Sequence, residues 1–438
     1  MECSDVSSTI SSVLAWEALD SRGNPTVACE VRLRGGATGT AIAPSGASTG
    51  AHEAHELRDG GSRYRGKGVL RAVANVNGPL AKAVIGLDSS DQRGVDETLR
   101  ATDGSGNLSK LGANAALAVS LATLKAAAAA AQQPLWRYAA ADDLPAELPM
   151  PMINILSGGA HAGRAVDIQD VLVMPVGATS FAQALEWVDR VRWATAAHLN
   201  DLGYSTALVA DEGGYGPQLP TNRAALDVVT RGIERAGFAP RTDVGIALDI
   251  AATQFFDASS QRYVLTAEDR QLTAAQWAEE LAQWAEDFPV ISIEDAMAED
   301  DWEGWVEVTD QLGARTQIIG DDLFTTSVDR LQHGNKLGAA NAVLVKPNQI
   351  GTVSDARALI QAANDSSYAT VLSARSGETE ESWLADLSVA WRTGQIKVGS
   401  LARSERTAKW NRLLQLEAEL AGEATFAGRS GIAPRRRS

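Results

Sequence analysis

Acidic side chains end three successive strand-like segments in the second half of the chain. The segment VGIALD ends at Asp249, VISIED ends at Glu294 and Asp295, and QIIGDD ends at Asp321 and Asp322. If these segments are strands of one parallel sheet, their carboxyl ends meet at one edge, where three carboxylates repel one another unless a cation joins them. Oxygen ligands favour Mg²⁺ or Mn²⁺ over zinc or copper. We therefore expect a divalent metal here; the alternative is that each carboxylate forms a salt bridge to a helix.

A lysine ends the next segment, NAVLVK, at Lys346. Beside a metal and other cations the ammonium form of a lysine is disfavoured, so its amine can accept a proton. A lysine at a strand end, taken alone, is more simply a salt-bridge partner. Next to the expected metal carboxylates, we interpret Lys346 as a base that removes a proton from a substrate carbon.

Other strand ends are typical of a site for a phosphorylated acid. Arg375 and Ser376 follow one segment, and an arginine beside a hydroxyl suits a phosphate group. Lys397 ends the last segment and would neutralise a substrate carboxylate. We expect Asp170 and Glu212 at further strand ends as a carboxylate pair, in which one pKa is raised enough for acid catalysis.

A single histidine, His161, lies in the loop GGAHAG. The glycines predict a loop mobile enough to act as a lid over the site. The plainer interpretation is that a lone loop histidine has no functional role.

The elements that must position these residues alternate between short apolar strands and amphipathic helices, such as the helix expected at 181–199. Such strands indicate a parallel sheet covered on both faces, and eight of them with crossovers of about 20–35 residues suit a TIM-type barrel. A doubly wound open sheet is the alternative, although the chain has no G-x-G-x-x-G or Walker loop. The expected strands are 171–174, 207–212, 244–249, 290–295, 317–322, 341–346, 369–373 and 395–398.

The first third of the chain has a different pattern, typical of an α+β domain. A strand is expected at 26–33, and a long helix is expected after Gly112. Pro149 and Pro151 mark a boundary near residue 143. We therefore expect three parts: an N-terminal α+β capping domain at 1–143, a barrel domain at 144–427, and a disordered basic tail at 428–438.

Composition and charge exclude several classes of protein. The formal net charge of −16 argues against non-specific nucleic-acid binding, and 45% apolar with 21% charged residues is typical of a globular protein. Two cysteines cannot form a disulfide framework, and the N-terminus lacks a signal-peptide pattern. The apolar stretch 113–131 contains polar residues and predicts a buried helix rather than a membrane span. We expect a cytoplasmic enzyme.

Long motifs from about Val13 to Gly428 resemble those of enolase, the lyase family that interconverts 2-phosphoglycerate and phosphoenolpyruvate. They are LDSRGNPTV, PSGASTG, GANAALAVSLA, ADEGG, SIED, GDDLF, KPNQIGT, RSGETEE, GQIK and RSER. The resemblance implies a small α+β cap on an eight-stranded barrel. It also implies a small phosphorylated hydroxy acid as substrate and assembly into a homo-oligomer.

The resemblance also implies a set of roles. Asp249, Glu294 and Asp321 would hold one Mg²⁺, and Ser48 would help to hold a second, with Mn²⁺ as an alternative ion. Lys346 would remove the C2 proton, giving an enediolate that both metals stabilise.

Further roles follow for the residues that face the substrate. Glu212 would protonate the departing C3 hydroxyl, and His161 would close over the site. The residues implied to contact the substrate are His161, Gln169, Asp170, Lys346, Arg375, Ser376 and Lys397.

Several residues depart from the enolase pattern. Ala374 replaces a histidine beside Arg375, Asp170 replaces a glutamate, and Arg164 adds a positive charge to the lid loop. These changes leave three functions open: an enolase; a paralogue such as the carboxyphosphonoenolpyruvate synthase of phosphonate biosynthesis; or a non-catalytic binding protein. The last would be expected to lose the metal carboxylates or Lys346, and all of them are present.

Four further departures concern assembly. By our alignment, typical enolases carry charged residues that pair across a dimer interface at the positions of Trp16, Ala28, Gln415 and Ala418, which are neutral here. Losing one charge would leave its partner unpaired at the interface, whereas losing all four leaves no unpaired charge. We therefore expect a more apolar dimer contact or a different oligomer.

Overall fold

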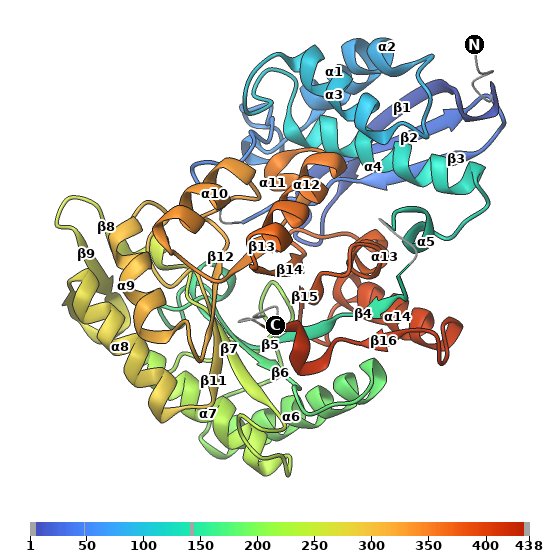
Figure 1. Ribbon diagram of the computed structural model, residues 1–438. Coiled ribbons are helices and arrows are strands. Elements are labelled where there is room, and N and C mark those ends of the chain that lie inside the picture. Colours follow the sequence, from blue (N-terminus) through green and yellow to red (C-terminus); the bar gives the residue numbers. More distant parts are fainter. Residues whose placement is uncertain (1–5, 48, 141–143, 433–438) are drawn as a thin grey trace.

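The computed structural model describes residues 6–47, 49–140 and 144–432. Figure 1 shows an N-terminal lobe, coloured blue to cyan, that lies against one side of a barrel formed by the rest of the chain. The strands of the lobe and those of the barrel belong to separate sheets. The expected boundary near residue 143 falls at 141–143, outside the described residues.

The N-terminal lobe is a three-stranded antiparallel sheet packed on helices. Its strands are β1 (Ile10–Leu19), β2 (Pro25–Leu33) and β3 (Thr38–Ile42), in that order. The alanine-rich α4 (Ala113–Ala130) packs so closely on β3 that a Cβ built on Gly39 would lie 2.2 Å from the Ala122 carbonyl oxygen. The other helices are α1 (Leu70–Asn75), α2 (Ala81–Val84), α3 (Gln92–Asp103) and α5 (Leu135–Tyr138).

Helix α4 is long and apolar enough by composition to cross a membrane, but 83% of it is buried inside the structure. It is the core helix of the N-terminal lobe. This agrees with the prediction of a buried helix for the apolar stretch.

Eight strands close the barrel, in agreement with the predicted fold. In order round the barrel they are β5 (Met150–Ser157), β6 (Asp170–Met174), β7 (Gly245–Asp249), β11 (Val290–Glu294), β12 (Gln317–Gly320), β13 (Ala342–Val345), β14 (Ala369–Ser373) and β15 (Gly394–Gly399). Almost every residue in them is buried, because one face packs on the outer helices and the other fills the interior.

Two details of the expected barrel are wrong. The segment 207–212 is not a strand; it is an irregular stretch and turn in which Leu208 is exposed. The missing strand is β5: we interpreted Pro149 and Pro151 only as a boundary, but Pro149 directly precedes this strand and Pro151 lies within it. The barrel is also not wholly parallel, because β6 runs antiparallel to both β5 and β7.

Helices surround the barrel, and most begin at a side chain that caps the helix. For example, the Ser180 side chain accepts a hydrogen bond from the backbone of Gln183, and Thr273 forms a capping box with Gln276. These helices are α6 (Phe181–Asp201), α7 (Asn222–Arg235), α8 (Ala274–Asp287), α9 (Trp302–Leu312), α10 (Val328–Leu337), α11 (Pro347–Ile350), α12 (Val353–Asp365), α13 (Trp383–Ala390) and α14 (Ser404–Glu419).

Short strands complete the structure. The hairpin strands β8 (Phe256–Asp257), β9 (Arg262–Leu265) and β10 (Arg270–Leu272) form a small sheet after β7, and β4 (Glu147–Leu148) pairs with β16 (Thr425–Phe426). The 3-10 turn at Gly428–Gly431 shows that the start of the segment 428–438, expected to be a disordered tail, is ordered. Residues 433–438, with the three terminal arginines, lie outside the described residues.

Candidate active site

One end of the barrel gathers nearly all of the residues singled out in the sequence. Asp249 and Glu294 are the last residues of β7 and β11, Asp321 directly follows β12, and Lys346 directly follows β13. A small cavity opens at this mouth. Its lining residues are Ala47, His161, Gln169, Glu212, Asp249, Lys346, Ser373, Ala374, Arg375, Ser376 and Lys397.

The Lys397 ammonium lies between two of the expected metal ligands. Its Nζ is 2.7 Å from Asp249 Oδ2 and 2.7 Å from both oxygens of Glu294. Burial and the neighbouring Asp249 carboxylate raise the pKa of Glu294 to about 8, even though Lys397 opposes this shift. In this geometry, Lys397 therefore balances only part of the negative charge of Asp249 and Glu294.

Asp321, the third expected ligand, has a different partner. Its Oδ2 accepts a hydrogen bond from Lys346 Nζ, and its Oδ1 accepts one from Gln349 Nε2 at 2.8 Å. Burial alone would lower the pKa of Lys346, but the Asp321 contact outweighs it and raises the pKa above its ordinary value. A carboxylate thus stabilises the ammonium form directly in this geometry, and the disfavoured ammonium expected beside a bound metal stays a prediction.

The site can offer only oxygen ligands to a cation at Asp249, Glu294 and Asp321, which fits a hard divalent ion. Three carboxylates here face two lysines, so negative charge is left over to attract a cation. Charge and ligand type thus agree with the expected metal.

Two tighter clusters occur among the described residues, with ligand atoms all within 4.8 Å of one another: Asp295, Asp321 and Asp322; and His161, Asp170 and Glu212. In the first, Asp295 is already used, because its two oxygens accept the backbone N–H groups of Asp321 and Asp322 at 2.8 and 2.9 Å. Asp295 therefore shapes the turn that presents Asp321.

The second cluster corrects the expected carboxylate pair. Asp170 and Glu212 have carboxylate oxygens within 4.8 Å of each other, and His161 contacts both, with Nδ1 2.7 Å from Asp170 Oδ2 and Nε2 3.9 Å from Glu212 Oε1. The expected pair is therefore a group of three. Asp170 also begins β6 rather than ending a strand, and Glu212 lies in a turn, where its carbonyl accepts the backbone N–H of Ser400 at 2.8 Å. His161 is buried, so in this structure it is part of the site wall rather than an exposed lid.

The pKa values of these three groups are shifted in different directions. Burial and the Glu212 charge raise the pKa of Asp170, against the opposing effect of His161. Burial would also raise the pKa of Glu212, but His161, Arg406 and Lys397 outweigh it and lower that pKa. Burial lowers the pKa of His161, yet Asp170 and Glu212 together raise it to about 9. The expected raised pKa therefore belongs to Asp170, and the proton is held chiefly by His161.

The expected phosphate-binding residues connect the barrel to the N-terminal lobe. Arg375 Nη1 and Nη2 donate to the Glu53 carboxylate at 3.0 and 3.2 Å, and Nη1 also donates to Asn348 Oδ1 at 3.0 Å. Ser376 Oγ accepts the backbone N–H of Ala47 at 2.8 Å. The prediction that Ser48 holds a second metal concerns a residue outside the described part of the chain.

Gln169 lines the central cavity and also contacts one of the expected metal ligands. Its Nε2 donates to Asp249 Oδ2 at 3.0 Å, and its Oε1 accepts from Gln254 at 2.6 Å. Arg164 is exposed and lines a separate small cavity with Gln254, outside the central cavity. Ala374, in contrast, lines the central cavity directly.

Sequence reasoning missed several residues that position the site. Arg406 is fully buried, and its guanidinium donates to the carbonyl oxygens of Arg375 and Val398 at 2.7 and 2.9 Å and to that of Ser376 at 2.5 Å. Glu53 was missed as well. The signal for Arg406 was present in the motif RSER, and that for Gln349 in KPNQIGT, directly after Lys346.

The four neutral positions expected at a dimer contact lie in two kinds of environment. Trp16, Gln415 and Ala418 are exposed, and Trp16 lies on the edge strand β1. Ala28, which pairs in register with Trp16, is fully buried within the chain. Its side chain is therefore not available to a partner, and the expected contact rests on the other three.

Family models for the two enolase domains match almost the whole chain. The model of the enolase N-terminal domain matches residues 10–139, and the model of the enolase C-terminal TIM barrel domain matches residues 145–435. These matches confirm the resemblance read from the motifs, and they agree with the closed barrel and the mouth described above. The chain therefore belongs to the enolase family of lyases.

Proposed function

We propose that this enzyme interconverts 2-phosphoglycerate and phosphoenolpyruvate. The single observation that carries the proposal is the position of Lys346, whose Nζ lies at the barrel mouth against Asp321 and faces the cavity lined by Asp249 and Arg375. A lysine base beside one or two Mg²⁺ ions is the general pattern of enolase-superfamily sites.

Lys346 can act as base only when its amine is neutral, and Asp321 now favours the ammonium form. Asp249, Glu294 and Asp321 would hold Mg²⁺, which supplies positive charge beside the substrate carboxylate when it is bound. If Asp321 held the ion, Lys346 would lose the contact that raises its pKa. The amine then accepts the C2 proton of the substrate at Nζ.

Loss of the C3 hydroxyl as water needs a proton on the opposite side of the substrate. Glu212 and His161 line the cavity with Lys346; His161 is hydrogen-bonded to Asp170, and its Nε2 lies 3.9 Å from Glu212 Oε1. Because His161 has a pKa of about 9, it carries a proton at neutral pH. Because the pKa of Glu212 is lowered, Glu212 is ionised at neutral pH and must first receive this proton from His161. We assign to Glu212 the transfer of that proton to the departing hydroxyl, and to Asp170 the role of holding the imidazole.

The phosphate group is assigned to Arg375 and Ser376, and a second Mg²⁺ to Ser48. Arg375 has five N–H donors in a planar fork, so it can keep Glu53 while it binds phosphate. A cytoplasmic location and a homo-oligomer remain predictions.

A direct assay tests the proposal. Purified protein with Mg²⁺ and 2-phosphoglycerate should produce phosphoenolpyruvate, measured as new ultraviolet absorbance. Binding of 2-phosphoglycerate by calorimetry without any turnover would reject the proposed reaction. Failure to bind either Mg²⁺ or substrate would favour a non-catalytic protein.

One observation favours a second candidate, a paralogue that acts on a related phosphorylated or phosphonate substrate, such as a carboxyphosphonoenolpyruvate synthase. Ala374 lines the central cavity beside Arg375, where a histidine is usual, and leaves more room there. Arg164 gives less support than the sequence suggested, because it lines a different cavity. Turnover of a bulkier phosphorylated acid in preference to 2-phosphoglycerate would favour this candidate.

A further inference from the structure

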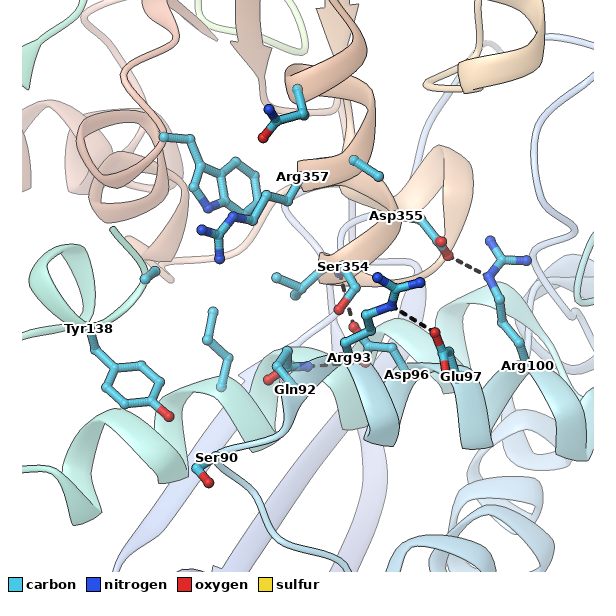
Figure 2. A pocket seen from close by; sticks show the side chains of 16 residues that line it. Ser90, Gln92, Arg93, Asp96, Glu97, Arg100, Tyr138, Ser354, Asp355 and Arg357 are labelled. Atoms are coloured by element: carbon cyan, nitrogen blue, oxygen red, sulfur yellow. Dashed lines mark hydrogen bonds and ion pairs between the residues drawn. The ribbon is translucent and has the colours of Figure 1, made fainter. Parts of the chain in front are cut away.

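A second and much larger cavity, of about 510 Å³, lies away from the barrel mouth, where the N-terminal lobe meets the barrel. Helices α3, α4 and α5 of the lobe form one side, and α12 with the end of α13 forms the other (Figure 2). None of its lining residues lines the mouth. Its volume is in the range of small-molecule sites.

The floor of this seam pocket is apolar and partly aromatic. Leu124, Val353 and Trp391 are each at least 94% buried, and each lines the pocket. Tyr138 forms the opposite wall and is half-buried, and burial raises the pKa of its hydroxyl. Such walls favour a ligand with a flat apolar body.

Two of the three arginines that line the pocket already have partners. Arg93 Nε donates to Glu97 at 2.7 Å, and Arg100 pairs with Asp355 and donates to the Ile350 carbonyl at 2.9 Å. These ion pairs cancel their own charge. They leave no net charge for a ligand.

The third arginine, Arg357, has no hydrogen bond or ion pair with any residue in the described parts of the chain. Figure 2 shows its guanidinium on the Tyr138 side of the pocket, away from Glu97 and Asp355. The indole N–H of Trp391 and the hydroxyl of Tyr138 likewise have no hydrogen bond within the described residues. Asp96 also lines the pocket, but its carboxylate accepts hydrogen bonds from Gln92 Nε2 at 3.0 Å and from the Ser354 backbone N–H at 2.9 Å. The groups left without a partner are therefore the solvent-exposed guanidinium of Arg357 and two polar donors.

We propose that the seam pocket binds a flat aromatic carboxylate. Its ring would lie against Trp391, Leu124 and Val353, and its carboxylate would accept hydrogen bonds from Arg357. One unpaired cation matches one negative charge, so a monoanion is favoured over a nucleotide or another polyanion. This site is separate from the proposed catalytic centre, and the inference does not depend on the reaction catalysed there.

Benzoate and its uncharged analogue benzamide are suitable probes, titrated into the full-length protein by calorimetry. Benzoate should bind saturably, while benzamide should bind at least about tenfold more weakly, because it lacks the charge that Arg357 recognises. Arg357→Ala should weaken benzoate binding by a similar factor. Arg93→Ala is the matched control, since this arginine lines the same pocket but is paired with Glu97, and it should leave the affinity unchanged.

Two further readouts fix the location. Benzoate should shift the indole N–H resonance of Trp391 in the nuclear magnetic resonance spectrum, and saturating Mg²⁺ with 2-phosphoglycerate should not displace it. The proposal is overturned by equal benzoate affinity in wild type and Arg357→Ala, by no saturable binding, or by displacement with 2-phosphoglycerate. Tighter binding of adenosine monophosphate than of benzoate would overturn the assignment to a monoanion.

Discussion

Replacing Glu53 with glutamine should release the loop that carries Ala47 from the barrel mouth. Glu53 and Arg375 form a buried ion pair between the N-terminal lobe and the barrel, with their side chains 7% and 3% exposed and two N–O distances of 3.0 and 3.2 Å. Removing the charge from one partner of a buried pair leaves the other charge poorly compensated.

The expected cost follows from these contacts. Glutamine keeps one carbonyl acceptor for Arg375 but turns an N–H group toward the second guanidinium nitrogen, so one charge-assisted hydrogen bond and the ionic attraction are lost. A hydrogen bond to a charged group contributes about 1.5–3 kcal/mol, and breaking a buried pair costs about 3–5 kcal/mol. We take about 3 kcal/mol, which corresponds to about a 150-fold change in the loop-opening equilibrium.

Hydrogen exchange at the Ala54 amide is the direct assay, because this amide donates to the Gln349 carbonyl at 2.7 Å and is protected only while the loop is seated. Exchange there should be about 150-fold faster in Glu53→Gln than in wild type. Glu97→Gln is the matched control: it makes the same chemical change in an exposed pair, with Arg93 and Glu97 side chains 83% and 65% exposed. Such pairs contribute at most about 1 kcal/mol. Less than about a threefold increase in Glu53→Gln, or equal effects in both variants, would refute the reasoning.

Three further predictions follow from other parts of the molecule. Lys346→Ala should abolish exchange of the C2 proton of 2-phosphoglycerate with solvent while substrate still binds; persisting exchange, measured by nuclear magnetic resonance, would show that another group is the base. Burial raises the pKa of Asp96 to about 6, above the value of 3.8 in the unfolded chain. The ionised carboxylate therefore lowers the free energy of unfolding above pH 6, and this destabilisation disappears as the pH falls toward 4. Wild type should therefore gain up to about 3 kcal/mol of stability relative to Asp96→Asn over that range in urea unfolding, and parallel pH profiles would count against the shifted pKa. Because Trp16 and Ala418 are exposed and neutral, self-association should persist as sodium chloride is raised to about 1 M in sedimentation experiments, and a salt-labile dimer would contradict an apolar contact.

The barrel could be predicted because most of its strands are specified locally. Short buried segments such as β11 and β13 are almost entirely apolar, and a charged residue ends the first and directly follows the second, so their positions are visible in the sequence. The segment 207–212 looks equally apolar, yet Leu208 and Val209 are exposed in the structure. Apolar composition alone does not reveal whether a segment pairs with a neighbouring strand.

The partners of the catalytic side chains could not be predicted, because they are far away in the chain. Arg375 and Glu53 are separated by 322 positions, and Lys397 and Asp249 by 148. Residue type predicted that Lys397 would neutralise a carboxylate, but it did not indicate that the carboxylates would be those of Asp249 and Glu294. Long-range pairing of this kind depends on how the loops close over the mouth.

The antiparallel strand β6 explains why Asp170 and the expected metal carboxylates share one mouth. In a wholly parallel barrel Asp170, the first residue of β6, would lie at the opposite end from Asp249, the last residue of β7. Because β6 is reversed, the two residues are direct register partners. The reversal also lets the connection 158–169 begin and end at the mouth, since Ser157 at the end of β5 pairs with Asp170. His161 lies in that short connection and is therefore held against Asp170. This contact buries the imidazole, whereas the sequence predicted a mobile lid for the same loop.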